Sequence, residues 1–148
     1  VRAKADGARD TIGTYDRRAP GLFFVPVEGF VFVVDNVPAA ADSTGFRLSK
    51  LSLVGDTVFS NVWRTRADLV PETGADAAFL SPNGQIFVGQ PANGRSALWT
   101  IFARMGDPIA QFRVPADVRI MAVTPDHVFG LQRDGDTDVL IRYQLVRQ

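Results

Sequence analysis

The chain has 148 residues, of which 46% are hydrophobic and 22% charged, a composition typical of one globular domain with its own core. Sixteen basic residues balance sixteen acidic ones, and the resulting zero net charge argues against a nucleic-acid-binding surface. The absence of cysteine excludes disulfides, thiolate metal sites and cysteine nucleophiles. The longest apolar run, Leu22–Val34, is interrupted by Pro26, Glu28 and Gly29. It therefore predicts buried strands and not a membrane-spanning helix, which needs about 20 apolar residues.

Residues 1–21 are predicted to form an N-terminal arm that precedes the main domain. The segment Val1–Ala19 is polar and lacks hydrophobic periodicity before Thr11. We therefore expect it to order only against a partner, with one strand at Thr11–Tyr15. Because the chain begins at Val1, both a removed leader and further upstream residues remain open.

Residues 22–148 are predicted to form an all-β domain, because short apolar or alternating runs are separated by turn residues throughout. Turn dipeptides include Gly55-Asp56, Asn83-Gly84, Gly106-Asp107 and Asp134-Gly135, with a further one at Asn93-Gly94. Two long loops are expected, at Asn36–Gly45 and Arg64–Ala75. The predicted strands are Leu22–Val27, Phe30–Asp35, Phe46–Leu53, Thr57–Trp63, Ala77–Ser81, Gln85–Gln90, Ser96–Phe102, Ile109–Val114, Val118–Val123, His127–Gln132 and Asp138–Leu145.

Three segments repeat one pattern: an apolar strand, a proline turn and a second strand centred on phenylalanine. Their prolines are Pro26, Pro82 and Pro125. The spacing is similar to that of β-propeller blades, roughly 40 to 50 residues. The strands then group into Leu22–Trp63 and Ala77–Val114, with four each, and a last group of three from Val118. Thr11–Tyr15 is predicted to supply the missing outer strand of that last group.

The segments Val123–Asp134 and Asp138–Leu145 resemble the closing blade of bacterial six-bladed β-propellers of the NHL-like type, and Phe46–Leu51 resembles the third strand of such a blade. The resemblance implies a truncated propeller-like array of about three four-stranded antiparallel blades. It also favours a periplasmic or extracytoplasmic location, with the cytoplasm still open. Three blades leave two apolar blade faces without a neighbour. Pairing with a second copy, docking on another protein, a fragment of a longer chain and a different barrel or sandwich all remain open.

Few residues point to catalysis or metal binding. His127 is the single histidine and lies at a turn, where a histidine commonly binds nearby backbone, and no Gly-x-Ser-x-Gly elbow accompanies it. The run Asp134–Asp138 places oxygen ligands at alternate positions, but Val139 and Leu145 stand where an EF-hand needs Gly and Glu. It is interpreted as a hairpin tip, with a calcium site as the alternative. No cofactor is predicted, and neither a catalytic nor a metal-binding residue is assigned.

The residues predicted to contact a protein partner are Arg17, Arg18, Arg64, Arg66 and Trp63. Arginine is favoured at interfaces because its planar guanidinium binds carboxylates and stacks on aromatic rings. Solvent-exposed charge is the alternative for the four arginines, and packing within a blade is the alternative for Trp63.

We therefore expect a non-enzymatic interaction or scaffold module, an accessory subunit that docks on a larger complex, with a membrane-associated complex as one option. Its open blade edge, its two long loops and its N-terminal arm are predicted to make the contacts. The alternative is a ligand-binding or hydrolytic six-bladed propeller formed by dimerisation, in which Asp126 and His127 are the residues to test. Nucleic acid is not an expected partner.

Overall fold

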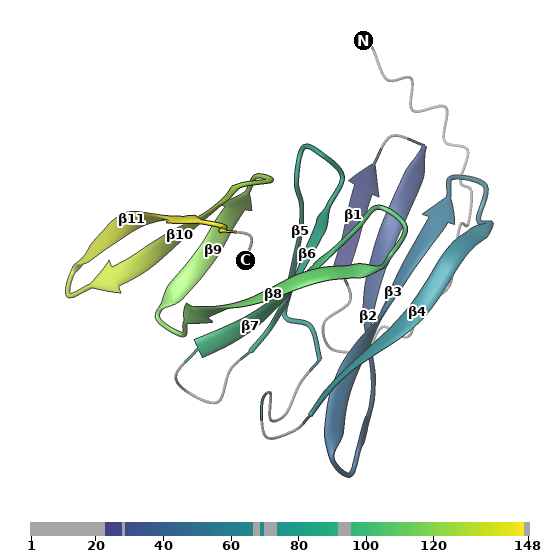
Figure 1. Ribbon diagram of the computed structural model, residues 1–148, viewed down its shortest axis with the longest axis horizontal. Helices are drawn as coiled ribbons and strands as arrows, with labels where there is room; N and C mark the ends of the chain where they lie inside the picture. Colours follow the sequence, from purple (N-terminus) through teal and green to yellow (C-terminus); the bar gives the residue numbers. More distant parts are fainter. Residues whose placement is uncertain (1–22, 28, 67–68, 70–73, 92–95, 147–148) are drawn as a thin grey trace, which may run out of the picture.

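A computed structural model describes residues 23–27, 29–66, 69, 74–91 and 96–146. Its strands form three antiparallel sheets, here called sheets A, B and C (Figure 1). Sheet A contains β1 (Phe23–Val27), β2 (Phe30–Ala40), β3 (Ser43–Ser52) and β4 (Thr57–Arg66). Sheet B contains β5 (Ala77–Leu80), β6 (Ile86–Gln90), β7 (Ser96–Phe102) and β8 (Pro108–Pro115). Sheet C contains β9 (Val118–Val123), β10 (His127–Asp134) and β11 (Thr137–Gln144). The predicted all-β fold is confirmed.

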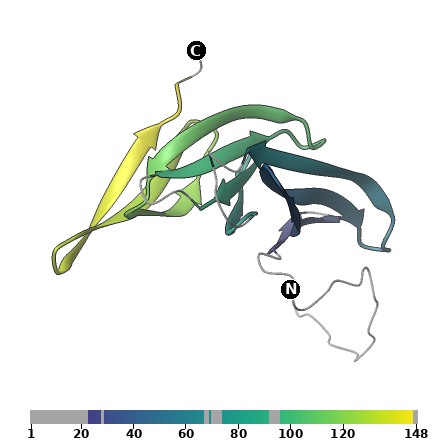
Figure 2. The same cartoon turned by 90° about the horizontal axis from the view of Figure 1, so that it is seen from below.

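Within each sheet the strands follow chain order from one edge to the other. The first strands of the three sheets, β1, β5 and β9, contact one another in succession. The sheets stand side by side, with sheet B between the other two (Figure 1), and the view from below shows the same order (Figure 2). The chain thus passes twice from the last strand of one sheet to the first strand of the next.

The core between sheets A and B is aromatic. Phe46 lies edge-on to Phe102 with ring centroids 5.8 Å apart, and Trp63 approaches the same ring at 5.7 Å. Phe32 and Leu48 of sheet A and Ile86 and Val88 of sheet B join this cluster and are almost fully buried. Alternate residues of each strand supply these side chains, as expected for packed sheet faces.

The core between sheets B and C uses the other face of sheet B. Trp99 stacks between Phe79 and Phe112, with ring centroids 5.9 and 6.3 Å away. Val118, Ile120, Val123 and Val128 pack against this cluster from sheet C. Every residue of β6 is buried, because sheet B is covered on both faces. A strand covered on both faces reads as a continuous apolar run, and this is the pattern of Ile86–Val88.

The predicted turns are confirmed at four places. Gly55, Gly84, Gly106 and Gly135 have φ between 60° and 92°, the left-handed region that glycine enters without steric cost. Asp134 pairs with Thr137, so Asp134–Asp138 is a hairpin tip, as predicted. Asn93-Gly94 lies outside the described residues.

Two predictions about sheet A are wrong. Asn36–Gly45 is not a long loop, because β2 continues to Ala40 and β3 begins at Ser43. Pro26 does not occupy a turn, because it pairs with Val31 inside the β1–β2 hairpin, whereas Pro82 and Pro125 do follow the ends of their strands. Pro26 is tolerated because β1 is the edge strand of its sheet.

Some predicted segments lie partly or wholly outside the described residues. The arm, Val1–Ala19, with its expected strand at Thr11–Tyr15, lies outside the described residues. Part of the expected loop Arg64–Ala75 also lies outside them, and its first residues belong to β4. In the part of the chain that the structure describes, no helix has the length and apolarity to cross a membrane.

Candidate protein-binding surface

One face of sheet C points away from sheet B, at the end of the row of sheets (Figure 2). In the strand register, Ala122, Phe129 and Arg142 form one row across this face. Arg119, Leu131 and Leu140 form the next row. We call these six residues the open face of sheet C. Leu140 is 69% exposed, and Phe129 and Leu131 are only half-buried, so apolar side chains of two rows meet solvent.

The outward face of sheet A, at the other end of the molecule, differs from the open face of sheet C in the burial of its side chains. The face of sheet A that points away from sheet B holds Val33 and Leu51, which are 0% and 6% exposed. Ser49 and Ser60 share a hydrogen bond of 2.8 Å on the same face. The sequence predicted two uncovered apolar faces, and the centre of the sheet A face is instead buried. Val62, 51% exposed, lies at the β4 edge of the same face, so exposed apolar side chains of sheet A lie at its edge and not at its centre.

The free edge of β11 adjoins the open face. Sheets A and B each contain four strands, but in sheet C β11 pairs only with β10 among the described strands. A groove of about 780 Å³ runs between β8 and the end of sheet C, lined mainly by apolar side chains that include Ile109, Phe112, Leu145 and Val146. The corresponding groove between β4 and sheet B measures about 360 Å³ and is bordered by Gly106, Asp107 and Pro108, where the chain enters β8. A fourth strand paired with β11 would narrow the larger groove, as the start of β8 narrows the smaller one.

Charged side chains gather at the tip of the β10–β11 hairpin. A polar groove of about 360 Å³ is lined by Asp117, Arg119, Leu131, Arg133, Asp136, Thr137 and Asp138. Acidic and basic groups alternate here, and the described residues contain no group of three metal-ligating side chains. The open face thus has an apolar centre with a charged end, which is the usual layout of a protein interface.

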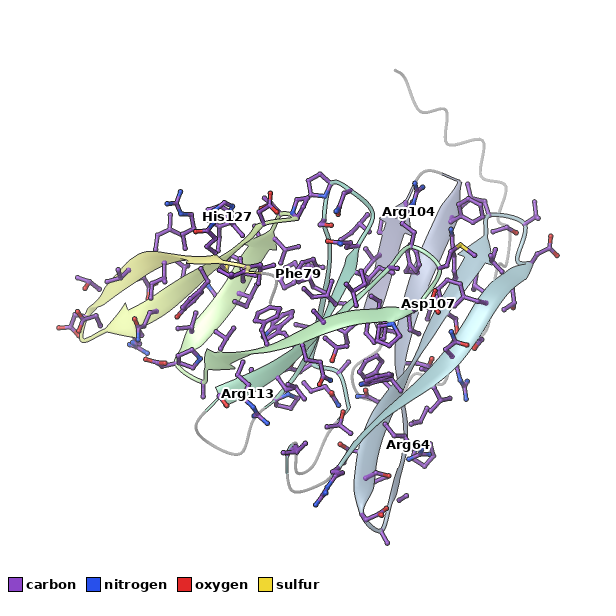
Figure 3. The ribbon with its side chains drawn as sticks, in the orientation of Figure 1. Arg64, Phe79, Arg104, Asp107, Arg113 and His127 are labelled. Atoms are coloured by element: carbon purple, nitrogen blue, oxygen red, sulfur yellow. The ribbon has the colours of Figure 1, made fainter. Side chains whose placement is uncertain are left out.

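The predicted partner-binding residues do not belong to this surface. Trp63, Arg64 and Arg66 lie on β4, in sheet A, and Figure 3 shows Arg64 at the opposite end of the molecule from His127. Trp63 packs on Phe102 in the core between sheets A and B. Arg64 is exposed and donates to the Pro38 carbonyl at 3.3 Å. Arg17 and Arg18 lie outside the described residues.

The main chain of His127 stabilises the turn that precedes β10. Its backbone N–H donates to the Thr124 hydroxyl at 3.0 Å, and its carbonyl accepts the Thr124 N–H at 2.8 Å. The Asp126 carbonyl accepts the N–H of Leu145 at 2.8 Å and ties the end of sheet C to the same turn. These contacts use the main chain of His127 and not its imidazole, so the backbone-binding interpretation of the side chain and its catalytic role both stay hypotheses.

Two polar features were not predicted, one between sheets A and B and one within sheet A. The buried Thr65 hydroxyl of β4 donates to the Gln90 side-chain oxygen of β6 at 2.9 Å. On the outward face of sheet A, Asp35 has one carboxylate oxygen buried without a hydrogen-bond partner. Burial raises the pKa of Asp35, and Arg47, 3.7 Å from its other oxygen, only partly offsets this effect. Gln90 ends β6, and Asp35 ends the predicted strand Phe30–Asp35 but lies inside β2. A polar residue directly after an apolar run is the one signal the sequence offers.

Comparison with known proteins assigns this chain to no family. Neither family models, curated proteins nor solved structures give a significant match to this chain.

Proposed function

We propose that the protein is a non-enzymatic interaction module, a propeller-like segment of three blades that docks on a larger assembly through the open face of sheet C and the free edge of β11. The observation that carries the proposal is the exposure of Leu140, at 69%, beside Phe129 and Leu131. Apolar rows on a folded sheet are costly in water and mark an interaction surface.

Three features support the propeller-like arrangement. The sheets are antiparallel, their first strands contact one another in succession, and the chain enters each new sheet through that first strand. Antiparallel sheets repeated in this way are the building plan of propellers. The resemblance of Val123–Asp134 to a closing blade of bacterial proteins also supports an envelope location.

The partner is a polypeptide that adds a strand to β11. An edge strand exposes a row of unpaired N–H and C=O groups that another strand satisfies through its main chain. The apolar groove beside β11 accepts the alternate side chains of such a strand. The arm Val1–Ala19 is a further contact in this proposal.

Site-specific photo-crosslinking tests the surface. A photoreactive residue replaces Leu140 in the full chain, and the protein is illuminated in a lysate of the cells that make it. A matched control places the same residue at Leu53, which is 55% exposed in the turn between β3 and β4. We expect a discrete polypeptide adduct from position 140 alone. Equal or absent labelling from the two positions would refute the interface.

The arm is tested separately by deleting Val1–Asp10. The shortened protein should fold, with an unchanged far-UV spectrum, yet leave the assembly during size-exclusion chromatography. If it remains bound, the arm makes no essential contact.

A further inference from the structure

The described edge strands other than β11 each carry a feature that discourages pairing with a second chain. β1 contains Pro26, β8 begins at Pro108 and ends at Pro115, and β5 has only 4 residues. β4 and β9 pair with their neighbours through a shifted register. Prolines, short strands and bulges are the usual protections of an exposed edge. β11 has none of them, because its 8 residues include no proline and pair with β10 without a shift.

The backbone groups of alternate β11 residues point to its free edge. In an antiparallel pair, successive residues alternate between exchanging hydrogen bonds with the neighbouring strand and pointing away from it. The Leu145 N–H donates to the Asp126 carbonyl at 2.8 Å, and these two residues continue the register of the β10–β11 pair. Counting back from Leu145, the N–H and C=O groups of Asp138, Leu140 and Arg142 therefore face away from β10.

The sequence of β11 is complementary to itself. When two copies run antiparallel about a two-fold axis at Leu140, Leu140 faces its own copy, and each Asp138 faces an Arg142. These are the residues whose backbone groups face the free edge, so each pair exchanges hydrogen bonds in both directions. Opposite charges directly across two strands stabilise the pairing, whereas like charges destabilise it. A register shifted by one step toward the end of the strand would instead set Arg142 against Leu140.

Both faces of β11 gain contacts in this arrangement. Within one copy, neither Asp138 nor Arg142 forms an ion pair or a hydrogen bond with another described side chain. Pairing supplies each of them with a partner of opposite charge. On the other face of the strand, Val139, which is 43% exposed, comes to lie beside Ile141 of the second copy. Such β-branched pairs are favourable across antiparallel strands.

We propose that β11 pairs with β11 of a second copy of this chain, antiparallel about a two-fold axis at Leu140. The free edge of β11 lies at the outer border of the molecule in both views, so a second copy can approach it (Figures 1 and 2). This inference rests on the proposed function and names the strand that is added to β11. Because the axis is perpendicular to the sheet, the two open faces lie on the same side of one continuous sheet. They form a joined surface for the larger assembly.

Sedimentation velocity of the full chain over a range of concentrations tests the pairing. The wild type should form dimers. Asp138→Arg sets two cations against each other in each charge pair, and Arg142→Asp sets two carboxylates against each other. Each single variant should raise the dissociation constant of the dimer about tenfold, because like charges replace opposite ones at two places. The control is Asp107→Arg, which makes the same change of charge in the exposed turn between β7 and β8 and should leave the dimer unchanged.

Mixing the two single variants tests the register itself. In a mixed dimer every aspartate at these positions faces an arginine, so the mixture should dimerise as tightly as the wild type. Leu140→Pro provides a variant that does not depend on charge. It removes an N–H that faces the free edge and no hydrogen bond to β10, so the chain should fold and remain monomeric.

Three results would overturn the pairing: a monomeric wild type, single variants or Leu140→Pro that dimerise like the wild type, and a mixture no tighter than its components. A monomeric wild type refutes the second copy alone. The proposed interface still stands in that case if position 140 crosslinks to a different polypeptide. If position 140 also gives no adduct, both proposals are refuted.

Discussion

Replacing Asn36 with alanine should destabilise the fold substantially. The Asn36 side-chain oxygen accepts the N–H of Ala75 at 2.6 Å, and its amide donates to the Ala75 carbonyl at 3.2 Å. Ala75 is 1% exposed, so water cannot easily replace either bond. An unsatisfied buried backbone group costs about 1–3 kcal/mol. Allowing for partial rehydration, we expect Asn36→Ala to lower the free energy of unfolding by about 2–4 kcal/mol.

Urea denaturation followed by tryptophan fluorescence measures this change. In a thermal scan the same loss should lower the melting temperature by roughly 5–15 °C for a domain of this size. Asn61→Ala, at an exposed position on β4, is the control and should change the free energy of unfolding by less than about 0.5 kcal/mol. Asn36→Asp keeps the acceptor for the Ala75 N–H and loses only the donor to the Ala75 carbonyl, so its effect should be smaller than that of alanine. A loss below about 0.5 kcal/mol for Asn36→Ala would show that Ala75 is not anchored in this way.

Three further substitutions test the contacts between and within the sheets. A Cβ added at Gly74 would lie 2.0 Å from the Asn36 side-chain oxygen, so Gly74→Ala should break the same anchor and lower the urea midpoint. A Cβ at Gly89 would lie 2.7 Å from the Trp99 ring, which is held between two aromatic rings. Gly89→Ala should therefore cost about 1–3 kcal/mol and weaken the near-UV signal of Trp99, and an unchanged spectrum would contradict this packing. Thr65→Val removes the buried bond to Gln90 and should cost about 1–3 kcal/mol by urea denaturation, whereas Thr57→Val, at an exposed position, should be neutral.

The sequence predicted the grouping of strands well, because that grouping rests on local chemistry. Glycine at Gly55, Gly84, Gly106 and Gly135 permits a positive φ, and each of these turns joins neighbouring strands of one sheet. The division into two groups of four strands and one of three also matches the sheets. Turn residues and apolar alternation act over a few residues, so they can be read without tertiary structure.

The predicted loop at Asn36–Gly45 is wrong because contacts with distant parts of the chain determine the structure of this segment. Alanine, proline and aspartate are poor strand formers, and they led to the prediction of a loop. In the structure β2 extends through this region because β3 pairs with it as far as Ser43. Asn36 also fixes the strand by binding Ala75, which is distant in sequence. Such pairing overrides local propensity and leaves no short-range pattern.

The open face of sheet C was predicted from the number of strand groups, because strand composition alone does not distinguish it from a covered face. The strand β6 reads Ile86-Phe87-Val88-Gly89-Gln90, and β10 contains the similar run from Val128 to Gln132. All of β6 is buried, whereas Phe129 and Leu131 in β10 are only half-buried. The difference follows from the number of neighbouring sheets, because sheet B has two and sheet C has one among the described elements. A strand with apolar residues on both faces has the composition of a sheet covered on both sides. The sequence of β10 is therefore typical of a sheet with two neighbours, and this is consistent with the protein partner proposed for the open face.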